Sequence, residues 1–325
     1  MSFIRHAFQT MNPLAQVVML GCIVLTFMAL AAGAGVLWAS GGDPATMQAL
    51  MQAGQTGGLQ RDAVLAMNNA NQLMAFLGTS WAFAGLVGLG FLGRFFLGAP
   101  RPRMLLLAVV VALGMSPVLD FTYRLNEWAL VPGSDLHAWA GALEAQAMAL
   151  TKALLTFEQT SEVWAVLLSV AVLPAVCEEW LFRGTLQPLL FRATGNVHVA
   201  VWVSAALFSA IHMQFFGFIP RMLLGAGFGY LVVYSGSLWP AILGHFVNNA
   251  GVVVAAWWMG NDWLNEGLEP QALSSWGATD WGTAVVALVA LGWALRALGS
   301  WGERGTYVNR LSSAATPTEQ TPLRS

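Results

Sequence analysis

The chain has 325 residues, of which 57% are hydrophobic and 9% are charged, and its formal net charge is −2. Because a soluble domain carries about 25% charged residues, this composition excludes an ordinary soluble domain and indicates a helical membrane protein. The small net charge gives no reason to expect a nucleic-acid partner. The two cysteines lie within apolar segments, which excludes a disulfide framework and a cysteine-rich metal site.

Apolar runs of roughly 17 residues or more are long enough to cross a bilayer as helices. Eight such runs lie near 15–38, 72–97, 103–120, 162–190, 197–217, 219–235, 237–258 and 281–299. The first is longer than the apolar core of a secretory signal, so we interpret it as a span. The sequence therefore predicts an all-α fold, a polytopic transmembrane helix bundle of about eight spans, with one transmembrane domain over residues 1–301.

Four segments outside these runs are polar. Segment 40–71 contains paired glycines and paired asparagines, which predict an external loop or a short surface helix. Segments 121–161 and 259–280 together carry eight of the 16 acidic residues and are predicted to be external loops. Segment 302–325 is rich in Ser, Thr and Pro and is predicted to be a disordered cytoplasmic tail.

The distribution of basic residues predicts the orientation, because cytoplasmic loops are enriched in Lys and Arg. With the N-terminus inside, ten basic residues fall on the cytoplasmic side: Arg5, Arg94, Arg101, Arg103, Arg183, Arg192, Arg296, Arg304, Arg310 and Arg324. Four fall outside: Arg61, Arg124, Lys152 and Arg221. Both termini are therefore predicted to be cytoplasmic, and the preference for arginine over lysine suggests a bacterial inner (plasma) membrane.

Two adjacent glutamates, Glu178 and Glu179, lie inside the run 162–190, where each ionised carboxylate costs several kcal/mol unless it is compensated. Glu179 and Arg183 are four residues apart on one helix face, which is the spacing of an ion pair. We predict that this pair supports the site. Neighbouring helix residues point about 100° apart, so Glu178 is free to face a cavity as a general base.

The other two chemical groups lie on separate runs. His212 is in 197–217, whereas His245 and Asn249 share one face of 237–258. Together with Glu178 these residues suit either of two designs. They can activate a water and stabilise a tetrahedral oxyanion, or Glu178, His212 and His245 can hold a zinc ion whose bound water attacks.

Pro174 lies one turn before Glu178 and has no backbone N–H. A carbonyl near Ser169 or Val170 therefore loses its helical partner and needs another donor. The sequence predicts a kink or a widened turn beside the site.

Three motifs occur in a defined order: Glu-Glu-x-x-x-Arg at 178–183, Phe-x-x-x-His at 208–212 and His-x-x-x-Asn at 245–249. In this order and spacing they resemble the CPBP family of type II CAAX prenyl endopeptidases, bacteriocin-processing proteins and Abi-type intramembrane proteases. The resemblance covers about residues 160–255.

The resemblance implies an intramembrane endopeptidase whose catalytic core comes from the fourth, fifth and seventh spans. It implies that Glu178 is the catalytic glutamate and that His212 helps to activate water. It also implies that His245 and Asn249 stabilise the oxyanion, and that Glu179 and Arg183 support the site. Members of the family are described both as metalloproteases and as glutamate proteases, and we favour the metal-free glutamate mechanism over zinc.

Nothing in the sequence argues for a prenylated substrate. We expect a membrane peptide, a membrane-protein segment or a bacteriocin-like leader. Two other functions remain open. One is a proton-coupled transporter, which also uses intramembrane Glu and His but is usually built from internal repeats that this sequence lacks. The other is a non-catalytic immunity or scaffold protein with the same fold.

Overall fold

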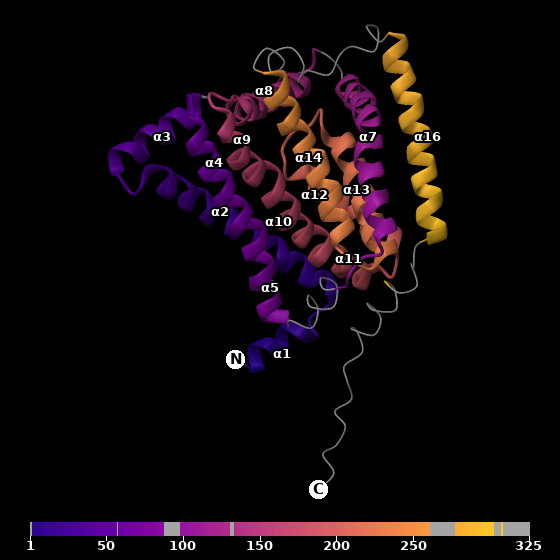
Figure 1. Cartoon of the computed structure of the whole chain (residues 1–325). Coiled ribbons are helices and arrows are strands. Elements are labelled where there is room, and N and C mark those ends of the chain that lie inside the picture. The colour runs from indigo at the N-terminus through magenta and orange to yellow at the C-terminus, as the bar shows by residue number, and fades with distance from the viewer. Residues whose placement is uncertain are drawn as a thin grey trace.

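The computed structural model describes residues 2–56, 58–87, 98–130, 133–260, 277–301 and 307, and its regular elements are all helical (Figure 1). The N-terminal group comprises α1 (Ser2–Thr10), α2 (Pro13–Ser40), α3 (Pro44–Thr56), α4 (Arg61–Ala70), the π-helix η1 (Asn71–Gly78) and α5 (Thr79–Val87). Next come α7 (Pro102–Ala129) and α8 (Asp135–Leu155). The predicted all-α fold is confirmed.

The remaining helices build the centre of the molecule and one edge. The chain passes through η2 (Thr160–Glu162), α9 (Val163–Val166), the π-helix η3 (Leu167–Val172), α10 (Leu173–Leu181), the π-helix η4 (Phe182–Leu186) and α11 (Gln187–Thr194). These six elements follow one another without a break, and we call them the site helix. They are followed by α12 (Val197–Ala210), α13 (Phe218–Ser235), α14 (Trp239–Met259) and α16 (Ala278–Trp301).

Within the described residues, six helices are long and apolar enough to cross a membrane. They are Pro13–Ser40, Pro102–Glu127, Thr160–Thr194, Phe218–Ser235, Trp239–Met259 and Trp281–Ser300. Six of the eight predicted spans correspond to these helices. The polytopic helical bundle is therefore confirmed.

The other two predicted spans differ from the structure. The run 72–97 is helical as η1 and α5 as far as Val87, and its end at 88–97 lies outside the described residues. The run 197–217 was predicted too long, because α12 ends at Ala210. Met213 has a positive φ of 53°, a conformation that cannot continue a right-handed helix. Residues 211–217 therefore form a turn segment, which we call the histidine turn.

Two polar segments are helical in the structure: 121–161, which was predicted as a loop, and 40–71, which was predicted as a loop or a short surface helix. Segment 121–161 contains the end of α7 and all of α8, whose N-cap Ser134 accepts a hydrogen bond from the His137 backbone N–H. Segment 40–71 contains α3 and α4, and α4 packs against α2 with Ala63 and Val64 buried. The polar composition of segment 40–71 predicted a surface position, but its Asn68 and Asn69 form hydrogen bonds with Ser169 of the site helix. The predicted loop 259–280 and tail 302–325 lie almost entirely outside the described residues.

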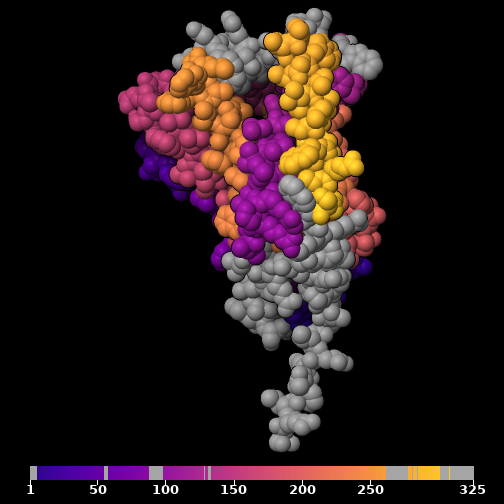
Figure 2. Space-filling view, turned by 45° about the vertical axis from the view of Figure 1, so that its right-hand side comes forward, coloured from indigo at the N-terminus to yellow at the C-terminus, as the bar shows by residue number. Residues whose placement is uncertain are grey.

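The site helix lies between two apolar clusters. On one side its residues Cys177, Leu181 and Phe182 join a cluster with α2, η1 and α5. On the other side α7, α12, α13 and α16 form the larger cluster, against which Trp180 packs. Figure 2 shows α16 lying along α7 on the outer face of this second group. The site helix is thereby held in the middle of the bundle (Figure 1).

The predicted widening beside Pro174 is present. The π-helix η3 ends at Val172, and Pro174 is the second residue of α10. The Ser169 carbonyl accepts a hydrogen bond from Asn68 Nδ2 at 2.8 Å, and the Val170 carbonyl accepts one from Asn249 Nδ2 at 3.0 Å. Side chains of neighbouring helices thus supply donors to carbonyls of the widened turn, beside which Pro174 provides no N–H, and this is how a proline is accommodated in a membrane helix. Such π-helical turns occur often at functional sites.

Candidate active site

A buried ion pair forms the centre of the candidate site. Arg183 Nη1 donates to Glu179 Oε1 at 2.6 Å, and both side chains are almost completely buried. Arg183 Nη2 donates to the Gly225 carbonyl at 2.7 Å, and the guanidinium lies over the Phe208 ring. The predicted pair of Glu179 and Arg183 is therefore formed, and it joins the site helix to α13.

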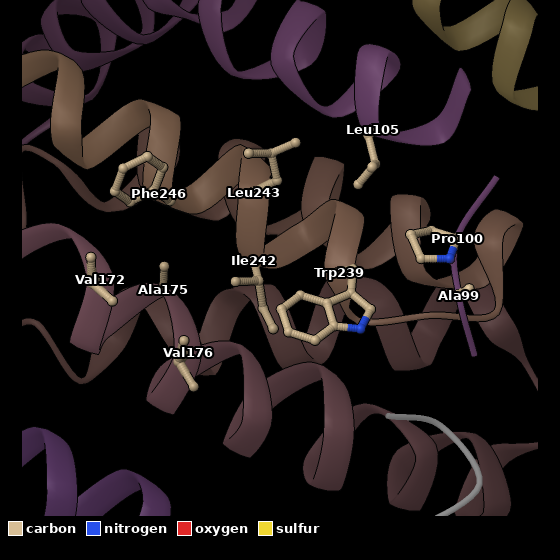
Figure 3. Close-up of a pocket in the computed structure, with 10 residues that line it drawn as sticks. All are labelled: Ala99, Pro100, Leu105, Val172, Ala175, Val176, Trp239, Ile242, Leu243 and Phe246. Atoms are coloured by element: carbon tan, nitrogen blue, oxygen red, sulfur yellow. The ribbon is translucent and has the colours of Figure 1, made fainter. Parts of the chain in front are cut away.

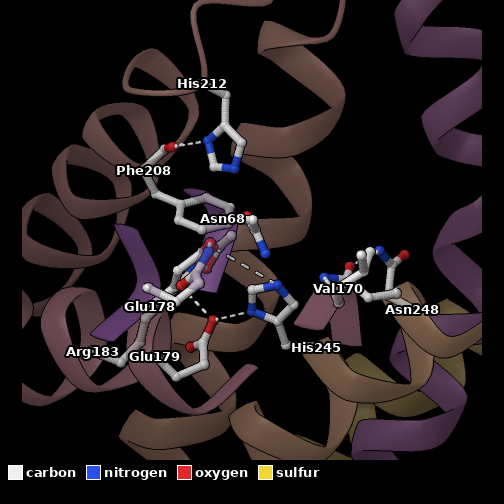
Figure 4. Close-up of polar contacts among 12 residues, drawn as sticks. Asn68, Val170, Glu178, Glu179, Arg183, Phe208, His212, His245 and Asn248 are labelled. Atoms are coloured by element: carbon white, nitrogen blue, oxygen red, sulfur yellow. Dashed lines mark hydrogen bonds and ion pairs between the residues drawn. The ribbon is translucent and has the colours of Figure 1, made fainter. Parts of the chain in front are cut away.

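His245 connects this pair to Glu178. Its Nδ1 lies 2.9 Å from Glu179 Oε1, and its Nε2 lies 3.9 Å from Glu178 Oε2 (Figure 4). Because an ionised carboxylate only accepts, the His245 proton belongs on Nδ1. The imidazole stacks on Phe228, which limits its rotation. His245 thus presents Nε2 toward Glu178.

Glu178 is 5% exposed and receives a hydrogen bond that the sequence did not suggest. Gln72 Nε2, from η1, donates to Glu178 Oε1 at 2.9 Å. The two adjacent glutamates therefore have different partners, as their angular separation predicts: Glu179 bonds Arg183 and His245, whereas Glu178 bonds Gln72.

His212 enters the site from the histidine turn. Its Nδ1 lies 2.8 Å from the Phe208 carbonyl, and its ring contacts the Phe208 ring, which also contacts His245. A carbonyl only accepts, so Nδ1 carries the proton and Nε2 is left as an acceptor. Burial, together with the nearby Arg221 charge, lowers the pKa of His212, so its imidazole is neutral at pH 7. In Figure 4 its ring extends toward His245.

The histidine turn is held by helices outside the site. From α7, Asn126 Nδ2 donates to the carbonyls of Phe215 and Phe216. From α8, Glu144 Oε1 accepts from Gln214 Nε2 at 3.3 Å. These bonds fix both the backbone and a side chain of the turn that carries His212.

Asn249 lies on the same face of α14 as His245, as predicted. Its Nδ2 donates to the Val170 carbonyl, and its Oδ1 accepts from Asn248 Nδ2 at 3.1 Å. One of the two Nδ2 hydrogens is used by Val170, which leaves the second for another acceptor. Asn249 therefore has a packing role in this structure, and its role toward an oxyanion stays a prediction.

The predicted zinc ligands do not form a metal site in this arrangement. Across the described ranges, no three His, Cys, Asp or Glu side chains are grouped so that they could hold a metal ion. His245 and His212 each use Nδ1 on an oxygen of Glu179 or Phe208. This leaves Nε2 of both rings as an acceptor, so the tautomers alone do not decide between water and a metal ion. Metal analysis of the purified protein tests the metalloprotease design.

The sequence did not identify three polar residues that attach α4 and η1 to the site helix. Asn68 and Asn69 bond Ser169 beside the widened turn, and Gln72 bonds Glu178. Asn68 and Asn69 were assigned to the polar segment 40–71, and Gln72 was included as the first residue of the predicted span 72–97, so none of the three was related to the site. The spacing of four between Asn68 and Gln72, which places them on one helix face, was the available clue.

An apolar cavity of about 610 Å³ lies beside the site, between α7, η3, α10 and α14 (Figure 3). Val172, Ala175 and Val176 line it from the site helix, and Ile242 and Phe246 line it from α14. All ten of its lining residues are apolar or aromatic. The cavity can hold a hydrocarbon group but supplies no catalytic group.

Gly225 offers a test of the central ion pair. A Cβ at this position would lie 2.9 Å from Arg183 Nη2 and 3.2 Å from Phe208 Cδ1. We expect Gly225→Ala to lower the free energy of unfolding by about 1–3 kcal/mol through overpacking. Gly227→Ala on the same helix is the control, because its Cβ would meet only Val111 Cγ1, at 3.4 Å. Thermal unfolding in detergent measures both, and equal midpoints would contradict the prediction.

Comparison with known proteins agrees with this geometry. Residues 160–251 match the family model described as type II CAAX prenyl endopeptidase Rce1-like. No match was found among curated proteins or among solved structures. The matched segment contains the site helix and the positions of Glu178, Glu179, Arg183, His212, His245 and Asn249. Over residues 160–251, the segment that carries the site, the chain is therefore similar to the Rce1-like type II CAAX prenyl endopeptidases.

Proposed function

We propose that this integral membrane protein is an intramembrane endopeptidase in which Glu178 activates a water molecule. The observation that carries the proposal is the buried arrangement of Glu178 and His245, with His212 beside it on the Phe208 ring. Buried carboxylates in membrane helices are usually functional, and these groups have the hydrogen-bonding capacity that hydrolysis needs.

In this mechanism Glu178 takes a proton from water, while His212 Nε2 accepts the second hydrogen bond of that water. The oxygen attacks the carbonyl carbon of the scissile peptide bond. With both ring nitrogens protonated, His245 donates from Nε2 to the resulting oxyanion, and the free hydrogen of Asn249 Nδ2 donates as well. Glu178 then returns the proton to the leaving amine, so the carboxylate is regenerated and one water is consumed.

The supporting groups have electrostatic roles. Glu179 orients His245 through Nδ1 and stabilises it when it is positively charged, and Arg183 compensates the charge of Glu179. The apolar cavity beside α10 and α14 suits an apolar part of a membrane-bound substrate. A membrane peptide or a segment of a membrane protein is therefore the expected substrate class, with the lipid bilayer as the surrounding solvent. The proposal also places the protein in a bacterial inner membrane with both termini in the cytoplasm.

The mechanism is tested by peptide cleavage with and without a strong chelator, together with metal analysis of the detergent-purified protein. We expect cleavage to survive chelation at an unchanged rate. Stoichiometric zinc with chelator-sensitive cleavage would favour the metalloprotease design instead. If no peptide in a broad membrane-peptide panel is cleaved, the transporter and immunity functions become the better hypotheses.

A further inference from the structure

Three amide side chains from outside the matched segment contact the site helix. We call Asn68, Asn69 and Gln72 the amide row. Asn68 Nδ2 donates to the Ser169 carbonyl at 2.8 Å, and Ser169 Oγ donates to Asn69 Oδ1 at 2.6 Å. One turn further on, Gln72 Nε2 donates to Glu178 Oε1 at 2.9 Å. The amide row thus joins α4 and η1 to the site helix, with its last member on the proposed catalytic carboxylate.

Gln72 occupies a place where apolar packing alone would favour another residue. It is 4% exposed, and its neighbours Ala75 and Phe76 belong to the apolar cluster around the site helix. Within the part of the chain that the structure describes, Gln72 Oε1 has no hydrogen-bond partner. A buried amide with an unsatisfied oxygen costs free energy. We therefore infer that the hydrogen bond from Gln72 Nε2 to Glu178 has a role beyond packing.

The bond to Glu178 has a specific electrostatic property. The Gln72 amide is a neutral donor, so it fixes one carboxylate oxygen without bringing a charge that would neutralise the base. With Oε1 held by Gln72, the second oxygen is directed to the His245 side, where Oε2 lies 3.9 Å from Nε2. A base that must meet a water in one geometry benefits from such fixation.

We propose that Gln72 is a positioning residue of the hydrolytic site, which holds Glu178 so that its free oxygen faces the water and the substrate. This inference rests on the proposed function. It implies that the active site is not complete within residues 160–251, since η1 supplies a required hydrogen bond.

The decisive variant is Gln72→Glu, which keeps the shape of the side chain and replaces the donor by a second carboxylate. Two carboxyl groups at this distance cannot both ionise easily and share one proton. We therefore expect the acid limb of the pH–rate profile to move to higher pH by about one unit or more. Cleavage at neutral pH should fall and should recover as the pH is raised.

Gln72→Leu is the second variant, because it fills the same volume and removes the donor. We expect its kcat to fall about ten- to a hundredfold with little change in KM, since Gln72 orients the base and does not touch the substrate. If both variants keep the kcat and pH profile of the unmodified chain, the inference is overturned and Gln72 is a packing residue.

Gln187 provides the matched control. Gln187 is also buried and lies on the site helix that carries Glu178. Its Nε2 donates to the Gly229 carbonyl and to Tyr307 Oη, the latter at 3.2 Å. Gln187→Glu and Gln187→Leu should lower thermal stability without moving the pH limb. A shift of that limb in the Gln187 variants as large as in the Gln72 variants would also overturn the inference, because the effect would then be general.

Glu178→Gln, measured in the same assay, distinguishes a failure of the proposed function from a failure of the role inferred for Gln72. If Glu178→Gln still cleaves, the proposed function fails, whatever Gln72 does. If Glu178→Gln is inactive and the Gln72 variants behave like the unmodified chain, the inference alone fails.

Discussion

Glu178→Gln is expected to lower the rate of peptide cleavage by about 10²- to 10⁴-fold while the protein still folds and inserts. The amide has the size of the carboxyl group but cannot take a proton from water. It can still accept the hydrogen bond from Gln72 through its oxygen, so the packing around the site is preserved. Single-turnover cleavage of a membrane peptide in detergent or proteoliposomes measures the effect.

A second glutamate provides the control for this variant. Glu127 lies on α7, where it pairs with Arg124 at 3.1 Å in a partly exposed position. Glu127→Gln removes a carboxylate of the same size that the proposed mechanism does not use, and the variant should cleave at the unmodified rate. Full activity of Glu178→Gln would remove the general base from the mechanism. Complete function of that variant in the cell would favour a non-catalytic immunity or scaffold role.

Much of the site could be predicted because its signals are local in the sequence. The ion pair of Glu179 and Arg183 follows from a spacing of four on one helix. The widened turn follows from Pro174, whose missing donor frees carbonyls at fixed positions upstream. The hydropathy of the long runs likewise predicted most of the spans, because a bilayer imposes a minimum apolar length.

The sequence predictions failed where the structure of a segment depends on contacts with residues far away in the sequence. Asn68 and Gln72 are polar, and sequence polarity does not distinguish water from buried hydrogen-bond partners about a hundred residues away. The end of α12 was missed because residues 211–217 remain mostly apolar, although the chain turns there and Asn126 of α7 binds the turn. Polarity and hydropathy report the average environment of a segment, whereas these contacts depend on which helices become neighbours.

Arg183→Met is expected to give the largest loss of stability, with the free energy of unfolding lowered by about 3–5 kcal/mol. The substitution leaves Glu179 as a buried charge whose remaining hydrogen-bond partner among the described residues is His245, and it also removes the donor to the Gly225 carbonyl. The matched control is Arg124→Met, which breaks a partly exposed pair with Glu127. Such exposed pairs contribute about 0–1 kcal/mol, so thermal or denaturant unfolding in detergent should separate the two variants clearly.

The double variant Glu179→Gln with Arg183→Met distinguishes a role in stability from a role in the reaction. In the double variant no carboxylate is left buried without its cation, so the free energy of unfolding should recover to within about 1–2 kcal/mol of the unmodified protein. The neutral amide can still accept from His245 Nδ1 but stabilises a charged imidazole much less than a carboxylate does. Cleavage should therefore stay low although the fold is restored. If activity recovers together with stability, Glu179 and Arg183 serve only to hold the site helix against α13.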